Sequence, residues 1–161
     1  KKRGMKKYKI FLALDRCKDI YACGRRQYIH IKHTGLTSSQ VLEIIHEVDN
    51  KFLSASKQYL YIVELLKIIN LPVIKTIYWN RFFLSSLLSK NSAYKNINYS
   101  ILLNKENPNR SIDGFMQEFL KSNAMNKKEV SYYLKKFKIT RNEATISNII
   151  YKYRYLLSDD I

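Results

Sequence analysis

The sequence predicts a mainly α-helical protein with short β-hairpins, arranged as a series of small tandem units. Apolar residues recur at helical spacing over most of the chain, and two stretches of alternating apolar residues flank turn-forming residues. A length of 161 residues with 46% hydrophobic composition can build one ordinary domain or two to three very small ones. The predicted units cover residues 1–33, 34–108 and 109–161.

The first predicted unit consists of one helix followed by a β-hairpin. Residues 6–15 have helical spacing, and residues 20–22 and 27–31 can form two short strands. The turn between the strands would contain residues 24–26, a glycine followed by two arginines. The hairpin would therefore have a basic tip.

The middle unit is predicted to contain three helices and a strand pair. The first helix would begin at a cap formed by Thr37 or Ser38, the second would cover residues 56–69 and the third residues 79–90. The strands would lie within residues 94–104. Pro72 prevents the second helix from continuing. On the third helix, the residues expected to face outward are Arg81, Ser85 and Ser89.

The last unit is predicted to begin with a helix over residues 112–121, capped by Ser111, and to continue into a helix-turn-helix. Asn126 can cap the first helix of that pair and Thr140 the second. The apolar residues at helical spacing are Val130, Tyr133, Leu134 and Phe137 on one helix and Ile146, Ile149, Ile150 and Tyr153 on the other. The polar stripe opposite them on the second helix consists of Arg141, Thr145, Asn148 and Lys152.

The predicted hairpin of the first unit is similar to part of a known fold family. Residues 19–30, with the sequence DIYACGRRQYIH, place an apolar strand, a basic turn with glycine and an aromatic strand after a helix. This string resembles the wing of bacterial tandem winged helix-turn-helix DNA-binding modules. The resemblance implies that the first unit is the back half of a winged-helix unit whose first helices precede Lys1. The three helices and strand pair predicted for the middle unit also look like a winged helix, and the last unit is expected to have little or no wing. It names a fold family rather than one function.

The charge distribution predicts a polyanionic partner. The formal net charge is +16, from 29 Lys and Arg against 13 Asp and Glu. Most of the excess lies in residues 1–33, with 11 basic and two acidic side chains, and in residues 126–155, with eight and two. Such a surface attracts phosphate polymers. We therefore expect sequence-specific or structure-specific binding of double-stranded DNA, by a transcription or replication regulator or by the accessory DNA-binding region of a larger protein.

The sequence favours a cytoplasmic protein without a membrane partner. No apolar run approaches the ~20 residues that span a bilayer. The basic start of the chain is followed by only a short apolar patch at residues 10–14, without a small-residue cleavage pattern, so it does not resemble a secretory signal.

The residues expected to contact DNA lie in the hairpin tip and in the C-terminal helix pair. The second helix of that pair is expected to enter the major groove, where Arg141 and Asn148 would reach base edges beside Thr145. Phosphate contacts are expected from Lys127, Lys128, Lys135, Lys136 and Lys152. In the hairpin, the residues expected to contact the sugar-phosphate backbone are Arg25, Arg26 and Tyr28.

A protein-interaction domain is the alternative function, in which a basic surface docks an acidic partner or the chain forms a homodimer. Trp79 and Phe82 are the candidate interface residues, because they belong to a weakly charged unit. Helical spacing places Phe82 at the edge of the core. An exposed aromatic side chain there would favour an interface.

Metal binding and catalysis are weakly indicated. Cys17, Cys23, His30 and His33 form a two-Cys, two-His set, but five residues separate the cysteines and six lie between Cys23 and His30, unlike a common zinc finger. The sequence has no Gly-rich phosphate loop, no G-x-S-x-G turn and no H-E-x-x-H motif. We expect no cofactor, no metal and no enzyme; in an enzyme that included this chain, the catalytic residues would lie elsewhere.

Overall fold

The computed structural model describes residues 7–107 and 111–158, and it confirms a mainly α-helical chain with short antiparallel hairpins. The elements in order are α1 (Lys7–Arg16), β1 (Ile20–Gly24), β2 (Gln27–His30), η1 (Ile31–His33), α2 (Ser38–Ala55), β3 (Tyr59–Tyr61), α3 (Ile62–Ile68), α4 (Arg81–Asn91), β4 (Lys95–Ile97), β5 (Ile101–Leu103), α5 (Ile112–Ser122), α6 (Lys127–Lys136), α7 (Glu143–Lys152) and η2 (Arg154–Leu156). None of the helices in this described part is long and apolar enough to cross a membrane.

The first described segment folds as expected into a helix and a hairpin. β1 pairs with β2 in antiparallel orientation, and the pairing of Gly24 with Gln27 leaves Arg25 and Arg26 as a two-residue turn. Arg26 takes a left-handed conformation, with φ 60°, and the strand register shifts between Ala22 and Gly24 beside the turn. Both arginine side chains are exposed at the tip.

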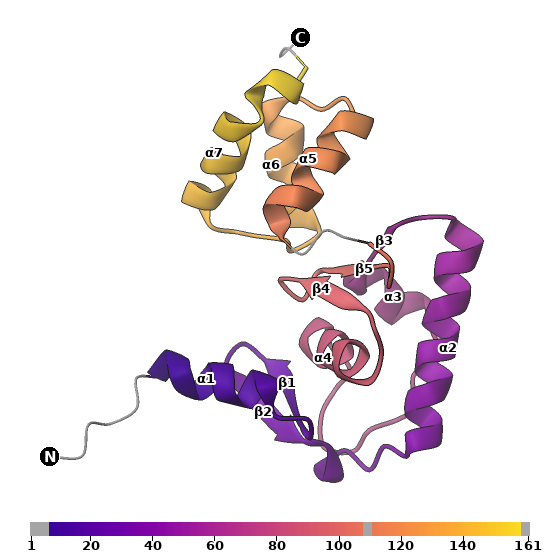
Figure 1. Cartoon of the computed structure of the whole chain (residues 1–161). Coiled ribbons are helices and arrows are strands. Elements are labelled where there is room, and N and C mark those ends of the chain that lie inside the picture. Colours follow the sequence, from indigo (N-terminus) through magenta and orange to yellow (C-terminus); the bar gives the residue numbers. More distant parts are fainter. Residues whose placement is uncertain (1–6, 108–110, 159–161) are drawn as a thin grey trace, which may run out of the picture.

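Strand β5 is shared by two hydrophobic cores. It is the central strand of a three-stranded antiparallel sheet with the order β3-β5-β4. Side chains alternate between the two faces of a strand. Leu102 therefore packs with α2, α3 and α4, whereas Ile101 and Leu103 pack with α5, α6 and α7, and all three are 0% exposed. The helical bundle of α5, α6 and α7 covers one face of the sheet and α4 lies against the other (Figure 1).

Residues 59–61 form strand β3, so the predicted helix over residues 56–69 is wrong at its start. Helix α2 ends at Ala55, its C-cap Ser56 has a left-handed φ of 49°, and α3 begins only at Ile62. Tyr59 and Tyr61 pack on the core of the C-terminal helices, whereas Leu60 packs on the other core. Pairing with β5 therefore overrides the helical spacing of this stretch.

Helix α4 lies at the centre of the middle segment and is covered by the β1–β2 hairpin (Figure 1). The backbone N–H of Ala22 in β1 donates to Ser86 Oγ at 3.1 Å, and Lys90 Nζ donates to the carbonyl oxygen of Cys17 at 2.8 Å. Ser85 is 0% exposed, so the expectation that it faces outward is wrong. Arg81 and Ser89, one turn before and after Ser85, form hydrogen bonds with Ser100 and Asn96, so this polar side of α4 faces the three-stranded sheet.

The C-terminal helix pair begins as predicted but its second helix starts later. Asn126 caps α6 within a capping box. Helix α7 is capped by Asn142, whose Oδ1 accepts from the backbone N–H of Thr145 at 3.1 Å, so the prediction that Thr140 caps it is wrong. Thr140 Oγ1 instead accepts from the backbone N–H of Asn142 at 3.2 Å. Arg141 therefore lies in the connecting segment and not on the helix.

Replacing Leu103 with alanine should lower the free energy of unfolding by about 2–5 kcal/mol, because the substitution opens a cavity in a fully buried part of β5. Urea denaturation of the whole chain measures this change. Val73→Ala is the matched control, since Val73 is 94% exposed, and it should change the free energy by less than about 0.5 kcal/mol. Equal effects of the two substitutions would contradict the shared core.

Candidate functional site

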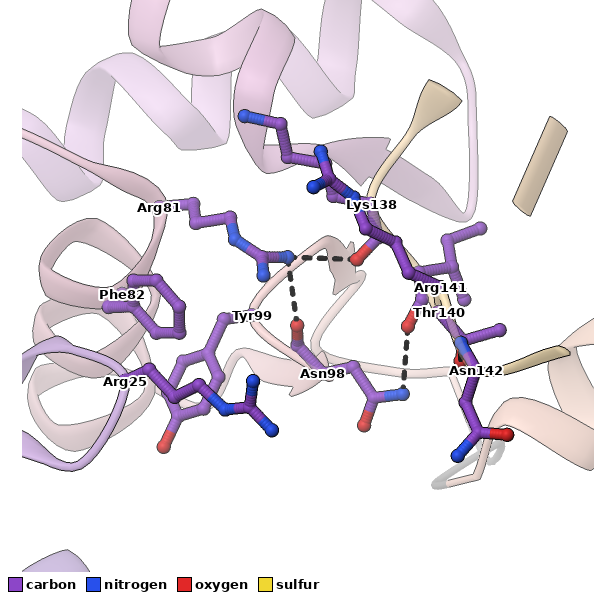
Figure 2. Close-up of a pocket in the computed structure, with 10 residues that line it drawn as sticks. Arg25, Arg81, Phe82, Asn98, Tyr99, Lys138, Thr140, Arg141 and Asn142 are labelled. Carbon is purple, nitrogen blue, oxygen red and sulfur yellow. Dashed lines mark hydrogen bonds between the residues drawn. The ribbon is translucent and has the colours of Figure 1, made fainter. Parts of the chain in front are cut away.

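A cleft of about 820 Å³ lies where four segments of the chain meet (Figure 2). Its walls are Arg25 from the β1–β2 turn, Arg81 and Phe82 from the start of α4, Asn98 and Tyr99 from the β4–β5 turn, and residues 138–142 between α6 and α7. We call it the basic cleft. It brings together parts of all three units predicted from the sequence.

Arg81 at the start of α4 forms a hydrogen bond with the segment between α6 and α7. Its Nη1 donates to the carbonyl oxygen of Lys138 at 2.8 Å and to Ser100 Oγ at 2.7 Å. Asn98 Nδ2 donates to the carbonyl oxygen of Ile139 at 3.0 Å (Figure 2). Charge-assisted hydrogen bonds such as those of Arg81 are the stronger kind, so they hold the Lys138 backbone next to Ser100.

The segment between α6 and α7 places its polar side chains at the surface for a local reason. Lys138 takes a left-handed conformation with φ 55°, which ends α6. The next residue, Ile139, is 2% exposed and belongs to the core of the C-terminal helices. With Ile139 buried between them, Lys138 and Arg141 remain exposed at the cleft.

The basic cleft concentrates positive charge. Arg25, Arg81, Lys138 and Arg141 all line it, and none of its lining residues is a carboxylate. Burial, and then the neighbouring charge of Arg141, lowers the pKa of the Arg81 guanidinium. Helices α4 and α7 also begin at the cleft, and the N-terminal end of a helix carries a partial positive charge. The cleft is therefore suited to an anion.

Two aromatic side chains lie on one wall of the cleft. The rings of Phe82 and Tyr99 are 5.2 Å apart between centroids, and the Arg81 guanidinium lies over the Phe82 ring at 4.7 Å. Both aromatic side chains are half-buried. Trp79, which the sequence pairs with Phe82, instead packs on Phe83 at 5.0 Å and donates through Nε1 to the carbonyl oxygen of Pro72 at 2.6 Å.

The predicted residues of the hairpin occupy different places. Arg25 lines the basic cleft, whereas the Arg26 guanidinium lies over the ring of Phe11 at 5.7 Å. The Tyr28 hydroxyl donates to Asp15 Oδ1 at 3.0 Å. Burial and this hydrogen bond raise the pKa of Tyr28 to about 12. Of the three residues, Arg25 is the one that the structure brings to the cleft.

The predicted lysines of α6 form a second basic surface. Lys127, Lys128 and Lys135 line a shallow groove beside Tyr132, whose side chain is exposed. Lys136 lies over the Tyr132 ring at 5.6 Å. All four lysines are exposed on one helix whose single acidic residue is Glu129, so the helix has a net positive charge.

Two of the predicted lysines form salt bridges with carboxylates. Lys135 pairs with Glu143 at 2.8 Å, and Lys152 on α7 pairs with Asp113. These pairs are exposed, and exposed ion pairs contribute little free energy, so either lysine can exchange its partner for another anion. On α7, Asn148 is exposed and Thr145 is half-buried.

Sequence reasoning missed four residues of the cleft as a functional site: Arg81, Asn98, Tyr99 and Lys138. The first three lie in the middle segment, whose low net charge does not indicate an anion-binding site. A search for clusters of basic residues in the sequence cannot find such a site, because the four basic residues of the cleft are spread over up to 116 positions, from Arg25 to Arg141. The three-residue turn that begins at Asn98 is the local feature that could have been recognised, since asparagine is common in turns.

The described residues contain no group of three or more His, Cys, Asp and Glu side chains that could hold a metal ion. Cys17 and Cys23 are free thiols, and burial raises the pKa of the Cys23 thiol. His30 Nδ1 accepts from the backbone N–H of Lys32 at 3.2 Å and caps η1. This histidine therefore has a structural contact.

Replacing Arg81 with methionine should lower the free energy of unfolding by about 1–3 kcal/mol, because the Lys138 carbonyl and Ser100 lose a charged donor. Chemical denaturation measures the change. Arg141→Met is the matched control: this exposed side chain only repels Arg81, so its loss should leave stability within about 0.5 kcal/mol or raise it slightly. A larger loss in the Arg141 variant would contradict the assigned roles.

The chain matches no protein-family model, and no curated protein or solved structure is significantly similar to it. We therefore infer its function from the chemistry of the basic cleft and of the lysine surface on α6.

Proposed function

We propose that this protein binds double-stranded DNA, as a regulator of transcription or replication or as the DNA-binding region of a larger protein. The observation that carries the proposal is the gathering of Arg25, Arg81, Lys138 and Arg141 in one cleft that has no carboxylate among its lining residues. Arginine and lysine side chains provide most of the affinity for phosphates. A net charge of +16 would also steer the protein towards a polyanion.

We further propose that residues 34–108 form a winged-helix-like unit. The order of helix, strand, helix, helix and hairpin, with a β3-β5-β4 sheet, supports this assignment. The β1–β2 hairpin packs on α4, so α4 is not free to enter a major groove. Helix α7 has an open polar side that includes Ser147 and Asn148, and it is the helix we assign to the groove.

In this arrangement the basic cleft and the lysines of α6 hold the DNA backbone while α7 reads the bases. Phosphate contacts fix the position of a protein on the duplex, and base-edge contacts supply the sequence preference. Arg141 lies in the cleft beside the start of α7, so it joins the two surfaces.

Fluorescence anisotropy of a labelled random duplex, titrated at several salt concentrations, tests the proposal. We expect the logarithm of affinity to fall linearly with the logarithm of salt concentration. Arg25→Ala and Arg141→Ala should each weaken binding to all sequences and reduce the steepness of this line by about 0.9, the value for one lost phosphate contact. Lys67→Ala is the control, because Lys67 is exposed on α3 and does not line the cleft.

Absence of binding at low salt would remove DNA as the partner. An acidic protein would then be the remaining candidate for the basic surface. Equal losses for the cleft variants and Lys67→Ala would show that net charge alone, and not the cleft, determines affinity.

Asn148→Ala should relax sequence preference by about 1–3 kcal/mol at one base pair if the side chain reads an adenine edge. The measurement compares variant and original proteins on a duplex selected from a random pool and on the same duplex with single base changes. Ser147→Ala is the neighbouring control on the exposed side of α7. An unchanged sequence preference in the Asn148 variant would mean that another part of the protein reads the bases.

A further inference from the structure

We propose that the basic cleft holds an unpaired nucleotide, so that the protein prefers DNA with a strand end over a continuous duplex. This inference rests on the proposed DNA binding and names the form of DNA that the same site takes. The base would lie against Tyr99 and Phe82, and its phosphate would lie beside Arg25 and Arg141. A cleft of about 820 Å³ falls within the ~300–1,000 Å³ of ordinary ligand sites.

The aromatic wall is the first observation behind the proposal. Phe82 and Tyr99 lie side by side in the cleft, with their ring planes tilted by 50°, and neither is fully buried (Figure 2). Inside a continuous duplex both faces of each base are already stacked, so these rings would have no base to contact. An unpaired base offers a free face, and stacking on aromatic side chains accepts any base.

The backbone of the β4–β5 turn is the second observation. Asn98 and Tyr99 both take left-handed conformations, with φ of 52° and 54°. Asparagine adopts this conformation readily, but it is uncommon for a bulky residue such as tyrosine. Strained residues tend to occur at functional sites, where the surrounding structure holds them. The turn would form with less strain if residue 99 were glycine or asparagine, and a tyrosine there places a ring in the cleft.

The arrangement of the cations is the third observation. Arg81 is held by the carbonyl oxygen of Lys138 and by Ser100, so it acts as a positioning residue for the wall. Arg25 and Arg141 are exposed and come from different segments that line the same cleft. A phosphate between them would offset the repulsion among these cations, and it would lie next to the aromatic wall, as the phosphate of a nucleotide lies next to its base.

The test compares three labelled DNAs by fluorescence anisotropy at one salt concentration: a blunt duplex, the same duplex with a three-nucleotide overhang, and the same overhang built from abasic nucleotides. We expect the ordinary overhang to bind about 5- to 150-fold more tightly than the blunt duplex, the range for stacking one base. The abasic overhang supplies the phosphates without the bases and should return the affinity close to that of the blunt duplex.

Two variants locate the preference in the cleft. Tyr99→Asn suits the left-handed backbone and Phe82→Leu keeps an apolar side chain, and each should bring the ratio of overhang to blunt affinity close to one. Tyr78→Leu removes an exposed tyrosine that does not line the cleft and should preserve the ratio.

Three outcomes would overturn the inference. They are equal affinity for the blunt and ordinary overhang DNAs, full preference for the abasic overhang, and a preference that survives in both cleft variants. In each of these cases salt-dependent binding of the blunt duplex would leave the proposed DNA binding intact. Failure to bind any of the three DNAs would remove both proposals.

Discussion

The burial of β5 on both faces is the constraint on which the rest of the structure depends. A three-residue strand in a small protein normally has one face towards a core and one towards solvent. Here Leu102 packs into one core while Ile101 and Leu103 pack into the other. The same strand therefore sets the position of the helices on each side of the sheet. It also brings the β4–β5 turn next to the segment between α6 and α7, where the basic cleft forms.

The cleft places like charges together, and hydrogen bonds from Arg81 to a backbone oxygen and a serine hydroxyl offset the resulting repulsion. Arg81 loses part of its hydration on burial and is repelled by Arg141, and both effects lower its pKa. Its contacts with Lys138 and Ser100 compensate for this unfavourable environment. Because Arg81 is held in place before a ligand arrives, it would lose little conformational entropy on binding. The preorganisation of this one cation is a physical reason for the proposed binding site.

Most of the elements could be predicted from local sequence, because caps and apolar spacing act over a few residues. Asn126, Ser111 and Thr37 cap the helices for which they were proposed. The errors arise where contacts between residues far apart in the sequence determine the local structure. Residues 59–61 become a strand because β5 lies beside them, and Ser85 is buried on the side of α4 where Arg81 and Ser89 contact Ser100 and Asn96 of the sheet. Periodicity within a segment carries no information about either neighbour.

The cleft could be predicted only in part for the same reason. Arg25 and Arg141 were identified from a basic turn and a polar stripe, both of which are local patterns. Their proximity depends on how the first hairpin and the last helix pair attach to the middle sheet. Helical spacing places Phe82 at the edge of the core. No spacing pattern indicates Tyr99, because its position in the cleft depends on a turn conformation.

The sharing of β5 also limits how this protein can change during evolution. The face formed by Tyr59, Tyr61, Ile101 and Leu103 is complementary to α5, α6 and α7. A recombination event that exchanged these helices for unrelated ones would leave that apolar face without a matching surface. The sheet and the last three helices are therefore expected to be inherited together, with compensating substitutions across their contact, although their order along the chain gives them the appearance of separable modules.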